Sequence, residues 1–341
     1  MKKILVTGGA GYIGSHTIIE LLKKMDTEVV SIDNYSNSDD STYKRIEKIA
    51  GVKVSYHPID LCDFEALKKV FALHPGISGV IHFAAFKSVG ESVEKPLRYY
   101  YNNLNGLINL LRICKEYKVN EFIFSSSCSV YGNTQVLPVT EVTPFGKSES
   151  PYANTKQMGE EILEHFAKAN PAFKAISLRY FNPAGAHDSG LNGELPIGKP
   201  SNLVPAITQF AIGKINQLYV HGADYPTRDG SCVRDYIHVS DLAQAHVMAS
   251  EKLLSLNDHN YRVYNLGTGR GVTVLEAIHA FEKVTGKKLA YQIGPRRAGD
   301  VVEIYSDNTL AKNELGWEPK KSIQEIMDSA WKWELQLRQS E

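Results

Sequence analysis

The sequence predicts an α/β protein built on a doubly wound parallel sheet, with a smaller mixed α/β unit after it. From residue 2 to about 182, short apolar runs alternate with helix-length segments. Several runs are dense in Val, Ile and Phe, as expected for strands that are buried on both faces. Strands that alternate with helices indicate a parallel sheet covered by helices on both sides. The runs are KILVTGG, EVVSIDN, KVSYHPID, GVIHFAA, EFIFSSS and FKAISLRYFN.

The composition is that of a globular protein without a dominant charge. Of the 341 residues, 43% are hydrophobic and 22% are charged, and Lys+Arg and Asp+Glu both number 38. A neutral chain favours neither nucleic acid nor an acidic surface as a partner. No apolar run approaches the roughly 20 residues that cross a bilayer, and the cysteines show no metal-like spacing. We therefore expect a cytoplasmic protein with reduced thiols, no metal, and no nucleic-acid or membrane partner.

The alternation loosens after Asn182, where residues 184–202 are rich in Gly, Pro and Asn. Long loops in compact domains are usually functional. We predict domains at 1–182 and 183–341, with an interleaved boundary because the strand at 263–266 can rejoin the first domain. In the second domain we expect a helix near LVPAITQFAIG, a strand near QLYVHG, a strand and helix in VRDYIHVSDLAQAHVMASEKL, a helix at TVLEAIHAFEKVTG, a strand at LAYQIGP and two short terminal helices.

A glycine-rich turn, LVTGGAGYIG, joins the first strand to the first helix. Gly8, Gly11 and Gly14 stand where a dinucleotide site needs a tight turn, a close approach of the backbone to a pyrophosphate, and close helix–strand packing. The helix N-terminus then directs N–H groups at the phosphates. Asp33 ends the second strand 19 residues after Gly14, close to the expected position of the acid that binds the adenosine ribose. The pattern predicts a Rossmann-type NAD site; the alternative is a glycine turn without a ligand.

Residues at the ends of later strands are further candidates. Asp60 ends the third strand, where its carboxylate can hold the adenine amino group; the alternative is an aspartate that starts the next helix. Ser127 ends the fifth strand, at the sheet edge where ligands of open α/β sheets bind. Its hydroxyl can bond a substrate oxygen and relay a proton, or it can cap a turn.

The stretch SPYANTK places Tyr152 and Lys156 four residues apart, which puts both side chains on one face of a helix. A tyrosine, whose pKa is about 10 in peptides, serves as an acid–base group only if that pKa is lowered. An ammonium one turn away lowers it, and the positive nicotinamide ring of NAD⁺ adds to the effect. We predict a catalytic pair; the alternative is a helix surface that carries both side chains by chance.

Together these motifs resemble a known family over essentially the whole chain. TGGAGYIG, HFAAFKSVGES, FSSSCSVYG, the YxxxK pair, RYFNPAGAH, VRDYIHVSDLA and RRAGD are similar to the extended short-chain dehydrogenase/reductases, and most similar to the UDP-glucose 4-epimerase family. The resemblance implies interconversion of UDP-galactose and UDP-glucose through a transient 4-keto sugar, with tightly held NAD. It implies Tyr152 as base, Lys156 as its partner and a ligand of the nicotinamide ribose, and Ser127 as assistant. It also implies cofactor contacts from Tyr12, Ile13, Asn34, Asp60, Leu61, Phe83, Ala84, Lys87, Asn102 and Phe181.

The substrate of such an enzyme carries a diphosphate, so a neutral chain must place positive charge locally. Arg234 in VRDY and Arg297 in RRAGD are candidates, because arginine meets phosphate oxygens bidentately. Asp300 can accept bonds from the uridine ribose; local ion pairing of these side chains is the alternative. The resemblance further implies substrate contacts from Asn182, Asn202, Leu203 and Tyr219, and from Lys87, Ser127 and Tyr152 at the sugar.

Two other functions remain open. A nucleotide-sugar 4,6-dehydratase shares the NAD chemistry, but that family carries an Asp-Glu pair where this chain has Cys128 and Ser129. A regulatory NAD sensor would bind the dinucleotide without turnover, and it would not need Tyr152, Lys156 and Ser127 together.

The resemblance also bears on substrate range and assembly. Ile304 stands where some relatives have a tyrosine and where relatives that accept N-acetylated sugars have a cysteine. We therefore predict UDP-N-acetylglucosamine and UDP-N-acetylgalactosamine as a secondary substrate pair. The helices near 94–118 and 152–169 are expected to form the four-helix contact of a homodimer, as in the family.

Overall fold

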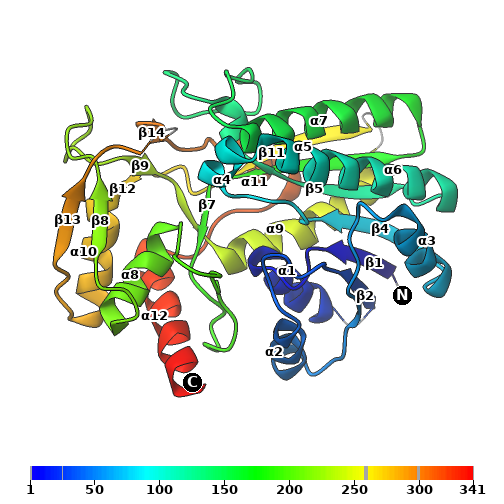
Figure 1. Ribbon diagram of the computed structural model, residues 1–341. Helices are drawn as coiled ribbons and strands as arrows, with labels where there is room; N and C mark the ends of the chain where they lie inside the picture. Colours follow the sequence, from blue (N-terminus) through cyan, green and yellow to red (C-terminus); the bar gives the residue numbers. More distant parts are fainter. Residues whose placement is uncertain (1, 25, 257–259, 298–299, 341) are drawn as a thin grey trace.

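The computed structural model describes residues 2–24, 26–256, 260–297 and 300–340, and it shows a seven-stranded sheet with helices on both faces (Figure 1). The strand order is β11-β6-β5-β4-β1-β2-β3, and every neighbouring pair is parallel. The predicted fold class is confirmed. The strands are β1 (Lys2–Thr7), β2 (Thr27–Ile32), β3 (Ser55–His57), β4 (Ile77–His82), β5 (Glu121–Ser127), β6 (Lys174–Tyr180) and β11 (Tyr261–Leu266).

Both faces of the central strands are buried, which is why these strands contain apolar runs such as residues 4–6 in β1. In β1, Ile4 and Val6 belong to one core cluster, whereas Leu5 between them belongs to another. The first face is covered by α1 (Tyr12–Leu22), α2 (Ser41–Ala50), α9 (Val239–Lys252) and α11 (Thr309–Leu315). The second face is covered by α3 (Phe64–Leu73), α6 (Gly106–Tyr117) and α7 (Pro151–Ala169).

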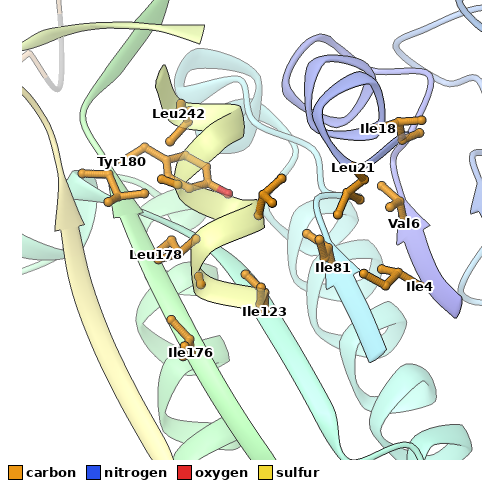
Figure 2. Packing of buried hydrophobic residues seen from close by; sticks show 14 of the residues in the cluster. Ile4, Val6, Ile18, Leu21, Ile81, Ile123, Ile176, Leu178, Tyr180 and Leu242 are labelled. Atoms are coloured by element: carbon orange, nitrogen blue, oxygen red, sulfur yellow. The ribbon is translucent and has the colours of Figure 1, made fainter. Parts of the chain in front are cut away.

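Figure 2 shows how the first core cluster forms. Side chains from neighbouring strands, among them Ile81, Ile123 and Ile176, lie on the same side of the sheet as Ile18 of α1 and Leu242 of α9. All five are at most 1% exposed. Burying a side chain of this size contributes roughly 1.5–3 kcal/mol, so this face fixes α1, and with it the glycine turn, against the sheet.

The second half of the chain forms three small sheets. The strand β7 (Asn182–Ala184) pairs with β10 (Tyr236–His238), and β8 (Leu218–His221) pairs with β13 (Tyr291–Gly294). The strand β9 (Val233–Arg234) lies between β12 (Val272–Thr273) and β14 (Glu303–Ile304). The helices α8 (Leu203–Ile212), α10 (Val274–Thr285) and α12 (Ile323–Ser340) share a separate core, the second core, with β7, β8 and β10. Shorter helices are α4 (Val89–Glu94), α5 (Pro96–Tyr100), η1 (Tyr101–Asn105), η2 (Cys128–Tyr131) and η3 (Leu253–Ser255).

Three elements of the second half, β11, α9 and α11, belong to the layers of the main sheet. The strand β11 pairs with β6, as expected for the run at 263–266, and α9 packs against α1. The division at residue 182 into two domains stays a prediction. Of the two short terminal helices predicted, α11 has 7 residues but α12 has 18. The prediction that both helices are short is wrong for α12, because Ile326, Met327 and Ala330 belong to the core shared with α8 and α10, and the buried Trp333 continues their helical spacing.

The strand order places the site. The chain leaves β1 toward β2 and β3, and it returns with β4 on the other side of β1. Loops at the carboxyl ends of β1 and β4 therefore diverge, and ligands of open α/β sheets bind in the crevice between them. Across the described ranges, the structure holds no helix long and apolar enough to cross a membrane.

Candidate active site

One large cavity, of about 800 Å³, lies over the carboxyl ends of the sheet strands. It begins at Asp33, passes the glycine turn, Ser127 and Tyr152, and ends at Arg234 in the second half. Every predicted cofactor residue lines it. These are Gly8, Gly11, Tyr12, Ile13, Gly14, Asp33, Asn34, Asp60, Leu61, Phe83, Ala84, Lys87, Asn102, Ser127, Tyr152, Lys156 and Phe181.

The glycine turn brings the backbone to the cavity wall. Gly8 has a φ of +72°, and a Cβ on Gly14 would lie 2.2 Å from the carbonyl oxygen of Gly8. The N-cap of α1 is Gly11, and no side chain caps this helix. Its N–H groups and partial positive charge therefore face the cavity without a side chain in front of them. This fits a pyrophosphate, which helix N-termini bind through backbone N–H groups.

Asp33 is fixed beside this turn. Its Oδ2 accepts a hydrogen bond from the backbone N–H of Ala10 at 3.0 Å, and its Oδ1 accepts from Tyr35 N and Ser38 Oγ at 3.0 and 2.9 Å. Burial raises the pKa of this carboxyl, whereas the hydrogen bonds lower it. The carboxylate is thus held at the end of β2, where a ribose hydroxyl of NAD would find an acceptor.

The neighbouring acid Asp60 accepts hydrogen bonds from Asn34 Nδ2 at 3.0 Å and from Cys62 N at 2.8 Å. The helix that follows is capped instead by Asp63, whose side chain accepts from Ala66 N. Asp60 therefore does not cap α3, and its contact with the cofactor stays a prediction. Arg45, which sequence reasoning missed, also lines this end of the cavity.

Tyr152 and Lys156 lie in the first two turns of α7. Ser150 caps the helix by accepting from Ala153 N at 3.2 Å, and Pro151 takes the N1 position that proline favours. The ammonium of Lys156 lies 5.9 Å from the ring centroid of Tyr152 and donates to the carbonyl oxygen of Ser125 at 2.5 Å. The cap and the i,i+4 spacing thus place both side chains on the same wall, beside the end of β5.

The electrostatics of this pair differ from the prediction. Burial raises the pKa of Tyr152 to about 12, although a hydrogen bond with Ser127 lowers it. Burial lowers the pKa of Lys156 to about 8, although the charge of Glu160 raises it. The effect of burial on Tyr152 outweighs that of the hydrogen bond with Ser127, so the groups of the folded chain do not make this phenol acidic.

Ser127 has two roles at once. Its hydroxyl accepts from Ser129 N at 3.2 Å and so caps the short helix η2, which was the alternative interpretation. The same side chain is hydrogen-bonded to Tyr152. Capping therefore does not remove Ser127 from the site; it fixes the hydroxyl oxygen next to the phenol.

A five-residue π-helix, η1, supports the site and was not predicted. Within it, Asn103 accepts from Phe86 N at 2.9 Å and donates to Phe86 O and Thr155 Oγ1, both at 3.1 Å. Thr155 in turn donates to the carbonyl oxygen of Tyr152 at 2.7 Å. Asn103 thus joins the loop after β4 to the helix that carries the tyrosine. π-Helical turns are rare and occur frequently at functional sites, but a polar run such as NNLN does not reveal one.

The other end of the cavity holds only some of the predicted substrate residues. Asn182, Asn202, Arg234 and Asp300 line it, and Arg234 lies 3.5 Å from Asp300, so these two also form the local ion pair that was the alternative. Among the described residues, the lining does not include Leu203, Tyr219 or Arg297, and Arg297 instead donates to Ser201 O at 3.4 Å. The roles of these three stay predictions. Ala298 and Gly299 of the RRAGD motif lie outside the described residues.

Comparisons with known proteins agree on the family. The family model described as GDP-mannose 4,6 dehydratase matches residues 5–330. The chain is 50% identical to a UDP-glucose 4-epimerase of Erwinia amylovora over 338 residues, which cover 99% of both chains. It resembles the crystal structure of UDP-glucose 4-epimerase from Bifidobacterium longum in complex with NAD⁺ and UDP, with a TM-score of 0.94, 45% identity and 98% of both chains covered.

A second solved structure is similar over the full length of both chains. This UDP-glucose-4-epimerase from Stenotrophomonas maltophila, with bound NAD and formylated UDP-arabinopyranose, is 42% identical to the chain with a TM-score of 0.95. The likeness covers both halves of the cavity, because 100% of each chain is included.

The close approach at Gly14 gives a direct test of the cofactor end. In Gly14→Ala, the new methyl group would force the turn away from Gly8 O, and we expect the purified protein to lose most of its bound NAD. NAD released by acid from the purified protein measures this. Gly90→Ala is the matched control, because a Cβ at Gly90 meets no atom within 4 Å. Equal NAD content in both variants would contradict the assignment of the turn.

Proposed function

The chain belongs to the UDP-glucose 4-epimerases of the extended short-chain dehydrogenase/reductases, and we propose that Tyr152, Lys156 and Ser127 perform its acid–base chemistry. Its activity is the NAD-dependent interconversion of UDP-galactose and UDP-glucose through a 4-keto sugar. The observation that supports the proposal is the placement of all three side chains on the wall of one cavity, next to the glycine turn.

The residues at the turn fit the dinucleotide, since Gly8 and Gly14 leave room for a pyrophosphate and Asp33 offers an acceptor for a ribose. When bound, NAD⁺ supplies a reversible oxidant for C4 of the sugar and a positive charge beside the phenol. Lys156 is proposed to hold the nicotinamide ribose, as in the family. Its ammonium donates to Ser125 O and keeps further N–H groups for such a bond.

Tyr152 is proposed to move the proton of the sugar 4-hydroxyl. As a phenolate it takes the proton from the hydroxyl oxygen, and as a phenol it returns the proton when the ketone is reduced. Ser127, hydrogen-bonded to Tyr152, can bond the same sugar oxygen and relay that proton. General acid–base catalysis of this kind typically contributes 10²–10⁴-fold. Because burial favours the neutral phenol, the phenolate requires a further positive charge in the site.

The two other functions weighed from the sequence lose support. A 4,6-dehydratase would need carboxylic acids beside Ser127, and Cys128 and Ser129 line that part of the wall instead. The match to the dehydratase family model therefore reflects the shared fold and NAD chemistry rather than water elimination. A protein that only senses NAD catalyses no reaction, so it would not need Ser127, Tyr152 and Lys156 together on the cavity wall.

Assembly and location are proposed from the surface and the cysteines. A stripe of exposed apolar side chains runs along α4, α5, η1 and α6, and the four cysteines are free thiols. We propose that the stripe is the contact of a homodimer, as in the family, and that the protein is cytoplasmic, which cell fractionation would test. The stripe consists of Val93, Leu97, Tyr101 and Ile108, which are 60%, 81%, 64% and 42% exposed.

The acid–base proposal predicts that Tyr152→Phe lowers kcat by about 10²–10⁴-fold while bound NAD is retained. The assay is formation of UDP-glucose from UDP-galactose with no NAD added, because the cofactor is regenerated within each turnover. Tyr117→Phe, at a half-exposed tyrosine on α6, is the control and should be fully active. A wild-type protein that carries NAD but forms no UDP-glucose would reject the function, and an active Tyr152→Phe variant would reject the role of the tyrosine.

Ile304 is the basis of a prediction on substrate range. It lines the sugar end of the cavity from β14 and is 3% exposed. Because isoleucine is smaller than tyrosine, we expect measurable turnover of UDP-N-acetylglucosamine, and Ile304→Tyr should lower it by about 10–200-fold relative to UDP-galactose. The ratio of kcat/KM for the two substrates measures this. An unchanged ratio would show that Ile304 does not contact the substituent at C2.

The dimer proposal predicts that the protein sediments as twice its chain mass at micromolar concentration. Leu97→Asp should convert it to a monomer, because a charge buried without a partner opposes association. Val142→Asp is the matched control, since Val142 is 88% exposed and lies outside the stripe. A wild-type protein that sediments as a monomer would rule the proposal out.

A further inference from the structure

The long loop at 184–202 carries a carboxylate into the cavity that no step above uses. Glu194 lines the cavity, and its side chain is only 12% exposed. Its Oε1 accepts from Asn202 Nδ2 at 2.6 Å and from Lys87 Nζ at 3.2 Å. One carboxylate oxygen therefore joins two residues that come from opposite sides of the cavity, one after β4 and one at the start of α8.

The loop that carries Glu194 is hydrogen-bonded to two helices, α12 and α1. The carbonyl oxygen of Glu194 accepts from Trp333 Nε1 of α12 at 2.9 Å, and a Cβ on Gly193 would lie 2.4 Å from the Trp333 ring. Asn192 donates to Ser15 Oγ of α1 at 2.9 Å. The loop is thus attached to a helix of the main sheet and to a helix of the second core. Because the loop is held on one side through the backbone of Glu194 and on the other through the side chain of Asn192, the position of the Glu194 carboxylate is set by the fold.

Without Lys87, the negative charge of Glu194 would oppose the binding of a nucleotide sugar. Glu194 places a negative charge close enough to Tyr12 to raise the pKa of that phenol further, after the larger effect of burial. A diphosphate in the same cavity would be repelled by an isolated carboxylate. Lys87 compensates this charge, and the carboxylate in turn restrains the ammonium of Lys87, whose side chain is 59% exposed. The amide of Asn202 is oriented by the same oxygen.

We propose that Glu194 is a positioning residue for the nucleotide sugar: it holds the ammonium of Lys87 and the amide of Asn202 across the mouth of the cavity, so that both face the bound diphosphate sugar. This rests on the proposed function and on the prediction from sequence that Lys87 and Asn202 contact the substrate. The ion pair alone contributes little, because Lys87 is largely exposed. The hydrogen bond from Asn202 to a charged acceptor is the stronger link.

The pairing predicts that the effects of removing Glu194 and Lys87 are not independent. Glu194→Ala should raise KM for UDP-galactose about tenfold with kcat within about threefold, the loss expected for one hydrogen bond to a charged group. Glu194→Gln keeps an acceptor for Asn202 and should raise KM less, about threefold. Lys87→Met leaves the carboxylate uncompensated and should also raise KM, whereas Lys87→Met with Glu194→Ala should be no worse than the more affected single variant.

The experiment measures kcat and KM for wild type and these four variants, together with the Kd of UDP by calorimetry and the NAD content of each preparation. Glu47→Ala, at an exposed side chain on α2, is the matched control and should equal wild type. An unchanged KM in Glu194→Ala, or single effects that multiply in the double variant, would overturn the inference. Failure of the proposed function gives a different result, an inactive wild type, and the UDP dissociation constants would still test the role of Glu194.

Discussion

The geometry of the site depends on one buried hydrogen bond, from the ammonium of Lys156 to the carbonyl oxygen of Ser125. It joins the start of α7 to the carboxyl end of β5. A buried ammonium without such a partner would be costly, so the rotation of α7 about its axis is set by this bond as well as by its apolar face. Tyr152, one turn earlier on the same face, is thereby directed at Ser127. The bond between Lys156 and Ser125 thus orients α7 relative to the carboxyl end of β5.

The same burial governs when the tyrosine can act. Taking a phenol and an ammonium out of water disfavours the charged form of each, which is why the pKa of Tyr152 rises and that of Lys156 falls. An i,i+4 lysine at 5.9 Å from the ring does not offset this desolvation. In the proposed mechanism, the phenolate is therefore stabilised by the positive charge of the oxidised dinucleotide. In this proposal the protein positions the phenol of Tyr152 and excludes water from it, and NAD⁺ adds the positive charge that stabilises the phenolate.

Much of the site could be predicted from the sequence, because the positions of these residues depend on short-range patterns within one strand, turn or helix. Glycine spacing, the acid at the end of β2 and the i,i+4 pair each determine where a side chain stands relative to its own strand or helix. Contacts between segments that are distant in the sequence cannot be predicted from such short-range patterns. Asn103 lies in a π-helical turn that has no simple sequence pattern, and Glu194 acquires its partners only when the loop folds between α1 and α12. The extent of desolvation at Tyr152 could not be predicted for the same reason, since it depends on everything packed around the group.

The distribution of polar groups along the cavity matches the demands of epimerisation. Asn202 and Arg234 line the end of the cavity where we propose that the diphosphate is held, and they can fix it through directional bonds to its oxygens. Ile304, at the proposed sugar end, belongs to an apolar cluster with Val130 and Phe181 and presents no hydrogen-bonding side chain. A keto sugar anchored through its nucleotide would meet little resistance there when it turns its other face to the oxidant. A site that bound both ends of the substrate with equal firmness would lower the energy of the starting complex and would resist this rotation.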